Sequence, residues 1–388
     1  MDPERELDPT LLRGAATARE PERAPAEGAA LCLSGGGYRA MLFHLGAIWR
    51  LNELGILRDL KRVSSVSGGS ITAGVLGSRW RELDFDRTTG VASRFVAEVA
   101  DPIHRLASTT IDVRSVLVGA LLPGVRISDR LEFAYRRLLF GEKTLQDLPS
   151  DHEGPRFVIN ATSLQTGALF RFSKPYMADY RVGKFLAPKV SLAKAVAASS
   201  AFPPVLSPVV LPLANENLEQ GTVDPAFADY RREAVLSDGG VYDNLGLETA
   251  WKRHKTVLVS NGGAAMKPDL HPAVDWLFGA VRVLSVIDNQ VRALRTRMTI
   301  DAFRSGIRQG TYFGIATDIA DYHLPDAIPV PHPRSLELAN VPTRLASMGR
   351  ELQERLVNWG YAVCDAAVRR WVRPQAPRPE RLPYSQEI

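Results

Sequence analysis

Two glycine-rich turns near the start of the chain carry residue types suited to chemistry on a carbonyl group. The first is Ser34-Gly35-Gly36-Gly37-Tyr38-Arg39, and the second is Ser65-Val66-Ser67-Gly68-Gly69. Each turn follows a short apolar run and precedes a helix-forming stretch. An α/β sheet uses this arrangement to present backbone N–H groups and one reactive side chain at the carboxyl edge of its strands. Together the turns predict an oxyanion hole and a serine nucleophile.

Ser67 is the candidate nucleophile because its surroundings approximate the pattern Gly-x-Ser-x-Gly, with Ser65 in place of the first glycine. Ser65 and Gly69 are small, as a strained turn that packs a strand against a helix requires. Serine and glycine also cluster in many turns, so an ordinary turn remains the alternative for Ser67. Ser64, Ser65 and Ser70 are interpreted as helix-cap or turn serines.

Gly35, Gly36 and Gly37 are the candidate oxyanion donors. Consecutive amides at a helix N-terminus favour negative charge, and glycine lets the backbone approach a ligand oxygen closely. The spacing Gly35-x-Gly37-x-x-Ala40 also fits a loose dinucleotide fingerprint. However, the acidic residue expected after the second strand is missing, since Asp59 precedes that strand. We therefore favour oxyanion binding over phosphate binding.

Asp238 is the candidate base for Ser67. None of the seven histidines lies in a glycine-containing turn at a strand end. Asp238 does, because it precedes Gly239 and Gly240 at the carboxyl end of an apolar strand that we expect in the same parallel sheet. A carboxylate in a partly desolvated site could take the serine proton without a histidine. A plain turn, with the two glycines supporting it, is the alternative.

The elements that position these residues alternate along the chain, which predicts an α/β fold with a mostly parallel central sheet between helices. Strands are predicted over 29–34, 62–66, 157–162, 168–172 and 256–260, and helices over 38–54, 68–79, 189–200, 272–310 and 343–372. Residues 84–148 are predicted to be largely helical, and 213–233 to form a surface loop.

The chain of 388 residues is long enough for one catalytic domain with extensions. Its hydrophobic content of 45% and charged content of 23% are ordinary for a globular protein. The predicted organisation is a disordered arm (1–28), a catalytic domain (29–262), a helical C-terminal extension (263–372) and a disordered tail (373–388).

Composition predicts few partners beyond a substrate. The net charge of +5 favours an anionic partner only weakly, and no nucleic acid is expected. Cys32 and Cys364 are far apart and indicate neither a disulfide framework nor a metal site, so no metal or cofactor is expected. Because no signal-peptide core or membrane-spanning run is present, the expected location is cytoplasmic, soluble or peripheral at the inner membrane surface.

Two segments are candidates for membrane contact. Residues 116–123 form an apolar run that fits either a core helix or a lid, and 281–308 combine arginines with apolar residues in a basic amphipathic pattern. For the second segment, a solvated helix face is the alternative. Its arginines are Arg282, Arg292, Arg295, Arg297, Arg304 and Arg308.

With the glycine loop, Ser67 and Asp238 in this order, residues 29–262 resemble the patatin-like phospholipase family. Three further stretches are similar to it: Asn160-Ala161-Thr162 with Thr166-Gly167, the segment from Ala198 to Val205 followed by Pro208, and Asp243-Asn244-Leu245-Gly246. Ser65 departs from the family, which usually has glycine there.

The resemblance implies a three-layer fold related to the α/β-hydrolases and a Ser-Asp dyad that hydrolyses acyl esters of phospholipids or related lipids. Ser67 would attack the carbonyl, Asp238 would take its proton and the Gly35–Gly37 amides would stabilise the oxyanion. Arg39 would hold either the glycine loop or an anionic headgroup, and a plain structural salt bridge is the alternative to these two roles. The alternative is a regulatory or binding module that keeps the lipase fold and uses its basic C-terminal helices to contact a membrane or a protein. The oligomeric state is left open.

Overall fold

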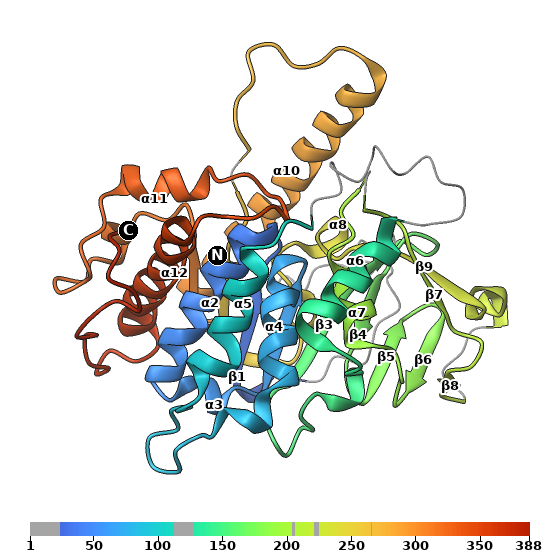
Figure 1. Ribbon diagram of the computed structural model, residues 1–388, viewed down its shortest axis with the longest axis horizontal. Coiled ribbons are helices and arrows are strands. Elements are labelled where there is room, and N and C mark those ends of the chain that lie inside the picture. Colours follow the sequence, from blue (N-terminus) through green and yellow to red (C-terminus); the bar gives the residue numbers. More distant parts are fainter. Residues whose placement is uncertain (1–23, 112–126, 204–205, 221–224, 265) are drawn as a thin grey trace, which may run out of the picture.

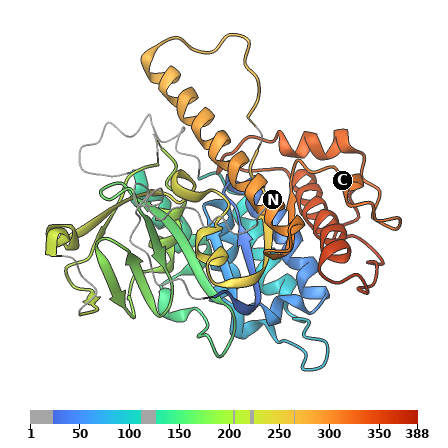
Figure 2. The ribbon, with the colours of Figure 1, turned by 180° about the vertical axis from the view of Figure 1, so that it is seen from behind.

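The described residues form a single eleven-stranded sheet that helices cover (Figures 1 and 2). The computed structural model describes residues 24–111, 127–203, 206–220, 225–264 and 266–388. Its strands are β1 (Ala26–Leu33), β2 (Arg62–Val66), β3 (Arg156–Ser163), β4 (Leu169–Phe172), β5 (Tyr176–Asp179), β6 (Gly183–Leu186), β7 (Val209–Pro212), β8 (Asn217–Leu218), β9 (Glu233–Asp238), β10 (His254–Asn261) and β11 (Gln309–Gly314). Its α-helices are α2 (Gly37–Glu53), α3 (Ile56–Asp59), α4 (Gly68–Ser78), α5 (Asp101–Ala107), α6 (Ile127–Tyr135), α7 (Leu192–Ser199), α8 (Gly240–Asp243), α9 (Glu248–Trp251), α10 (Trp276–Arg304), α11 (His332–Ala339) and α12 (Arg350–Trp371).

The centre of the sheet is parallel, in the order β11-β10-β1-β2-β3. Beyond β3, the short strands β4, β5, β6 and β8 continue it in antiparallel fashion. The predicted α/β fold with a parallel central sheet between helices is confirmed. The strands predicted over 157–162 and 168–172 are present as the antiparallel pair β3 and β4. Strands β5 to β8 were not predicted, because strands of two to four residues carry little periodicity.

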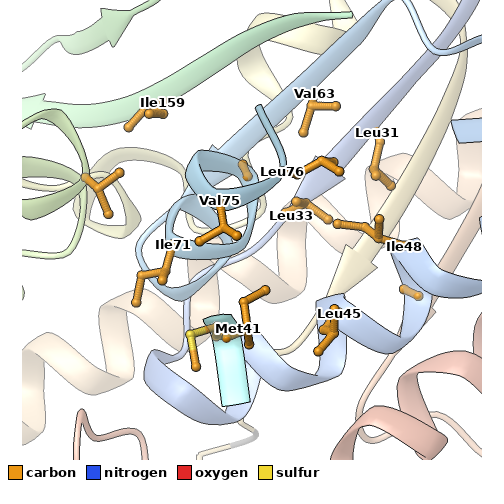
Figure 3. Close-up of a cluster of buried hydrophobic side chains, with 14 of the residues drawn as sticks. Leu31, Leu33, Met41, Leu45, Ile48, Val63, Ile71, Val75, Leu76 and Ile159 are labelled. Atoms are coloured by element: carbon orange, nitrogen blue, oxygen red, sulfur yellow. The ribbon is translucent and has the colours of Figure 1, made fainter. Parts of the chain in front are cut away.

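Strand β1 is buried on both faces, as parallel strands covered by helices are. Leu31 and Leu33 pack with side chains of α2 and α4 in the large core (Figure 3). Ala30 and Cys32 point to the other face and pack with residues of α9 and β10. The Cys32 thiol is fully buried, and desolvation raises its pKa. Both glycine turns therefore begin at the ends of rigid, buried strands.

The C-terminal extension is built into the same body. Strand β11 pairs in parallel with β10, and α12 packs directly on α2. A Cβ on Gly46 would lie 1.9 Å from the carbonyl oxygen of Val357, and a Cβ on Gly360 would lie 1.9 Å from that of Phe43. Only glycine allows the two helix backbones to approach so closely. The predicted helix over 272–310 ends earlier, at Arg304, because the chain turns into β11.

Both predicted disordered ends contain ordered residues. Strand β1 begins at Ala26, inside the predicted arm, while residues 1–23 lie outside the described part. In the predicted tail, the carbonyls of Tyr384 and Gln386 accept hydrogen bonds from Asn358 Nδ2 at 3.0 and 2.7 Å. The Pro- and Arg-rich composition suggested disorder, but these contacts with α12 hold the tail against the body.

Two sequence predictions concern possible membrane segments. The apolar run 116–123 lies outside the described residues. Within the described ranges, no helix combines the length and the apolar character needed to cross a bilayer. Residues 84–148, predicted to be largely helical, contain α5 and α6 along with short 3-10 and π turns.

Candidate active site

Ser67 lies in a strained turn between β2 and α4. Its φ of 51° and ψ of −121° place it in a region that non-glycine residues rarely adopt. The glycines after it allow this turn to pack tightly. A Cβ on Gly68 would lie 2.2 Å from the carbonyl oxygen of Gly37, and a Cβ on Gly69 would lie 2.5 Å from that of Leu33. The local sequence thus forms the sharp strand-to-helix turn that exposes a serine hydroxyl.

A cluster of buried serines supports this turn through hydrogen bonds. The Ser67 amide donates to Ser199 Oγ at 3.0 Å, and Ser199 Oγ donates to the Asn160 carbonyl at 2.6 Å. Ser70 Oγ lies 2.9 Å from Ser199 Oγ and donates to Ser65 Oγ at 3.0 Å. Ser65 therefore has a role that glycine could not perform, because its hydroxyl accepts a hydrogen bond within the cluster. No pattern in the sequence indicated a role for Ser199.

Asp238 reaches Ser67 because two strands meet end to end along one edge of β3. Strand β2 runs parallel to β3 until Val66 pairs with Asn160, and β9 runs antiparallel to β3 until Asp238 pairs with Ala161. The other edge of β3 is occupied by β4. The strand that carries Asp238 was expected to be parallel, and this expectation was wrong. Because the two strands run toward each other, their C-terminal residues converge.

The Asp238 carboxyl group is buried, with the residue only 1% exposed. Its Oδ1 accepts a hydrogen bond from the Gly240 amide at 2.7 Å, and its Oδ2 has no aligned partner among the described residues. Burial raises the pKa of Asp238 to about 7, although the Gly240 amide and the nearby Ser67 hydroxyl oppose this rise. A base with a pKa near neutrality beside a serine is suited to general base catalysis.

The buried histidines have other partners. His44, the one beneath the glycine loop, hydrogen-bonds the Ser260 hydroxyl at 2.8 Å and the Ser34 carbonyl at 2.9 Å. Burial lowers its pKa to about 4. His104 and His254 are also buried and bond to residues remote from the serine turn. Among the described residues, no histidine hydrogen bond reaches Ser67 or Asp238.

The glycine loop lies against the serine turn. A Cβ on Gly35 would lie 3.1 Å from Ser67 Cβ, and the Gly35 amide itself donates to the Asn244 carbonyl at 3.0 Å. Gly36 and Gly37 have φ values of 142° and 61°, which favour glycine. Their amides donate to no described residue. Two of the three predicted oxyanion donors are therefore available at the N-terminus of α2.

Arg39 is fully buried at the base of the loop. Its Nε donates to the Gly262 carbonyl at 3.1 Å, and its Nη1 donates to the Val341 carbonyl. Its Nη2 has no aligned partner among the described residues. Burial and the positive charge of Arg292 lower the pKa of Arg39 to about 10. These contacts fasten the loop to the C-terminal extension, which is one of the two roles considered for Arg39.

Two further residues border the site. Asn244 Oδ1 would lie 2.4 Å from a Cβ on Gly35 and 2.8 Å from one on Gly240, so its side chain fills the space between the two glycine turns. Arg292 of α10 lies on the far side of Asn244. Both residues belong to sequence patterns described above, but neither was expected at the site, because no local signal indicates which loop contacts which.

Solved structures of low similarity were found. Human GIVD cytosolic phospholipase A2 is 13% identical with a TM-score of 0.49, and the match covers 91% of this chain and 60% of that one. VipD from Legionella pneumophila is 15% identical with a TM-score of 0.36, covering 92% and 72%. The type III effector protein ExoU is 14% identical with a TM-score of 0.33, covering 89% and 54%. None of the curated protein sequences matched.

A family model provides the stronger comparison. The model described as "Patatin-like phospholipase" matches residues 31–251, which is more than half of the chain. The matched segment begins in β1 and ends in α9, so it contains both glycine turns and Asp238. It stops before α10 and α12. The chain therefore belongs to the patatin-like phospholipase family.

Proposed function

We propose that this protein hydrolyses carboxylic esters of phospholipids or related lipids, with Ser67 and Asp238 as a catalytic dyad. Ser67 Oγ attacks the ester carbonyl and forms an Oγ–C bond while Asp238 accepts the hydroxyl proton. The tetrahedral intermediate collapses, the C–O bond to the leaving alcohol breaks, and Asp238 returns the proton to that alcohol. Water then loses a proton to Asp238 and attacks the acyl carbon. The fatty acid departs as the proton returns to Ser67 Oγ.

The oxyanion of both intermediates would be stabilised by the Gly36 and Gly37 amides. They have no partner among the described residues and lie at the positive end of α2. In this proposal Gly35 shapes the loop, since its amide already bonds to Asn244. Removing one such donor typically costs about 3 kcal/mol of transition-state stabilisation.

The observation that carries the proposal is the convergence of a strained serine with a buried carboxyl group. Ser67 has a positive φ, and its hydroxyl interacts with an Asp238 whose pKa burial raises to about 7. Strained backbone and a perturbed pKa at one point are typical of catalytic sites. Family membership supports the same reaction class.

A fluorophosphonate probe tests the dyad directly. We expect the probe to label the wild type, and we expect labelling to be lost in Ser67→Ala and in Asp238→Asn. Ser78→Ala is the matched control, because Ser78 is a buried serine of α4 whose hydroxyl bonds only to its own helix. A folded wild type that neither reacts with the probe nor hydrolyses a phospholipid would refute the proposal.

We also infer peripheral contact with an anionic membrane through α10, which projects from the body (Figures 1 and 2). One face of α10 exposes an apolar row at alternating spacings of three and four residues. Five arginines against two aspartates give this helix a positive charge that complements anionic lipid. The row consists of Leu284, Ile287, Val291, Leu294 and Met298, which are 38–54% exposed.

Vesicle flotation tests this contact. Wild type should float with phosphatidylglycerol vesicles more than with phosphatidylcholine vesicles, and Ile287→Glu should reduce binding because it places a charge in the apolar row. Val274→Glu, on a fully exposed residue outside α10, is the control. If Ile287→Glu binds phosphatidylglycerol vesicles as well as Val274→Glu does, the role of α10 is refuted.

The buried thiols of Cys32 and Cys364 are compatible with a reducing cytoplasmic compartment.

A further inference from the structure

Helix α10 brings a second arginine to the glycine loop. Arg292 Nη1 would lie 2.5 Å from a Cβ on Gly263, and that same position is 3.5 Å from Asn244 Nδ2. Asn244 in turn abuts Gly35, whose Cβ position is 3.1 Å from Ser67 Cβ. Arg292, Asn244 and Gly35 thus lie in succession, and Gly35 borders the candidate nucleophile. The Arg292 side chain is 12% exposed, so it lies at the edge of the site and remains reachable.

The positive charge at this place is poorly balanced within the described residues. Arg39 is 0% exposed, and its aligned partners are two backbone carbonyls. The carboxylate nearest to Arg292 is that of Asp288, at a long 3.8 Å. Arg292 lowers the pKa of Arg39, which reflects the proximity of the two cations. Because burying like charges costs free energy unless an anion compensates them, this arrangement favours an anionic ligand.

The N-terminus of α2 strengthens this preference. Helix α2 has 17 residues, and the amides of Gly36 and Gly37 at its start have no described partner. The fully buried Arg39 Nη2, which also lacks an aligned partner, would lie 3.0 Å from a Cβ on Gly36. Free amides, a helix terminus and an unpaired guanidinium nitrogen are therefore grouped at the start of α2, next to Gly35. Such groups recognise oxyanions.

We propose that Arg292 binds the phosphodiester headgroup of a phospholipid substrate and positions its ester for Ser67. This inference rests on the proposed acyl hydrolase function and assigns the substrate class. A glycerophospholipid carries its phosphate only a few bonds from the ester carbonyl, as a contact so near Ser67 requires. The family match ends at residue 251, so the contribution comes from the C-terminal extension. Arg292 is a positioning residue for the substrate and takes no part in bond making.

The test compares Arg292→Gln with wild type on two soluble esters. One is a short-chain phosphatidylglycerol below its micelle concentration, and the other is uncharged p-nitrophenyl butyrate. We expect kcat/KM on the phospholipid to fall roughly ten- to a hundredfold, as for loss of a hydrogen bond to a charged group, with the butyrate rate unchanged. Arg292→Lys should recover part of the loss, because lysine keeps the charge but cannot make the two parallel hydrogen bonds of a guanidinium group. Arg297→Gln, which removes an exposed arginine from the same helix, should change neither rate.

Inorganic phosphate separates a headgroup site from a site for the free ion. If Arg292 serves the headgroup, millimolar phosphate leaves wild-type butyrate hydrolysis unchanged. If phosphate alters that rate in the wild type but not in Arg292→Gln, the site binds the free ion and the inference is overturned. An unchanged ratio of phospholipid to butyrate activity in Arg292→Gln also overturns it, while leaving the proposed function intact. Absence of both activities in the wild type would instead count against the proposed function.

Discussion

The burial of Asp238 makes a quantitative prediction about stability as a function of pH. The pKa of the carboxyl group rises from 3.8 to about 7 on folding. Between these values the folded state holds a proton that the unfolded state has released. The contribution of Asp238 to stability is therefore fully present below pH 4 and is lost as the pH rises from 4 through 7. The shift of about 3 pKa units corresponds to about 4 kcal/mol lost between pH 4 and pH 8.

Asp238→Asn removes this dependence, because the amide keeps an acceptor for the Gly240 amide and carries no charge. The difference in unfolding free energy between Asp238→Asn and wild type should grow by about 1.4 kcal/mol per pH unit from pH 4 to 7 and then level off. The measurement is urea unfolding of both proteins at several pH values. Asp243→Asn is not a suitable control, because burial also raises the pKa of Asp243.

The same group should govern activity. Only the ionised carboxylate accepts the Ser67 proton, so kcat/KM on an uncharged ester should rise with pH and level off above about 7. A stability difference that does not vary with pH would show that Asp238 ionises in the folded state as freely as in the unfolded state. An activity profile without this limb would show the same, and either result would refute the reasoning.

Two further predictions concern packing. Ser199→Ala leaves the Ser67 amide without its acceptor, so it should lower the unfolding free energy by roughly 1–3 kcal/mol and slow fluorophosphonate labelling. The control, Ser78→Ala, should label at the wild-type rate. Equal labelling rates of the two variants would contradict a supporting role for the serine cluster. Gly360→Ala places a Cβ 1.9 Å from a carbonyl oxygen of α2. It should lower the free energy of unfolding by at least about 1–3 kcal/mol, measured by thermal or urea unfolding. Gly349→Ala, where a Cβ meets nothing within 4 Å, is the control and should change stability little.

Local patterns were enough to single out the parts of the candidate site. Ser67 and the Gly35–Gly37 loop stand out because a strained strand-to-helix turn tolerates only small residues, and these small residues are close neighbours in the sequence. The central parallel strands were predictable for a similar reason, since long apolar runs such as β1 and β10 are typical of strands buried on both faces. The order of the motifs indicated the family.

Other features depend on contacts between distant segments. The antiparallel course of β9 places Asp238 at Ser67, but strand direction is set by pairing with β3, which no property of β9 alone reveals. The Gly35 amide looks like a free donor in the sequence, yet its bond to Asn244 assigns it a different role. Likewise, Ser65 departs from the family pattern, and only the structure gives a reason for it, because its hydroxyl accepts a hydrogen bond from Ser70.

The sequence by itself thus determined the kinds of groups available at the two turns, because their spacing is governed by short-range backbone geometry. Only the tertiary structure decided which amides remain free, how far Asp238 is desolvated and which charges from α10 reach the site. Those properties arise from burial and from register between segments far apart in the chain. Arg292 illustrates the difference, since on a helical wheel it is one arginine among several, and only the fold places it beside Gly263.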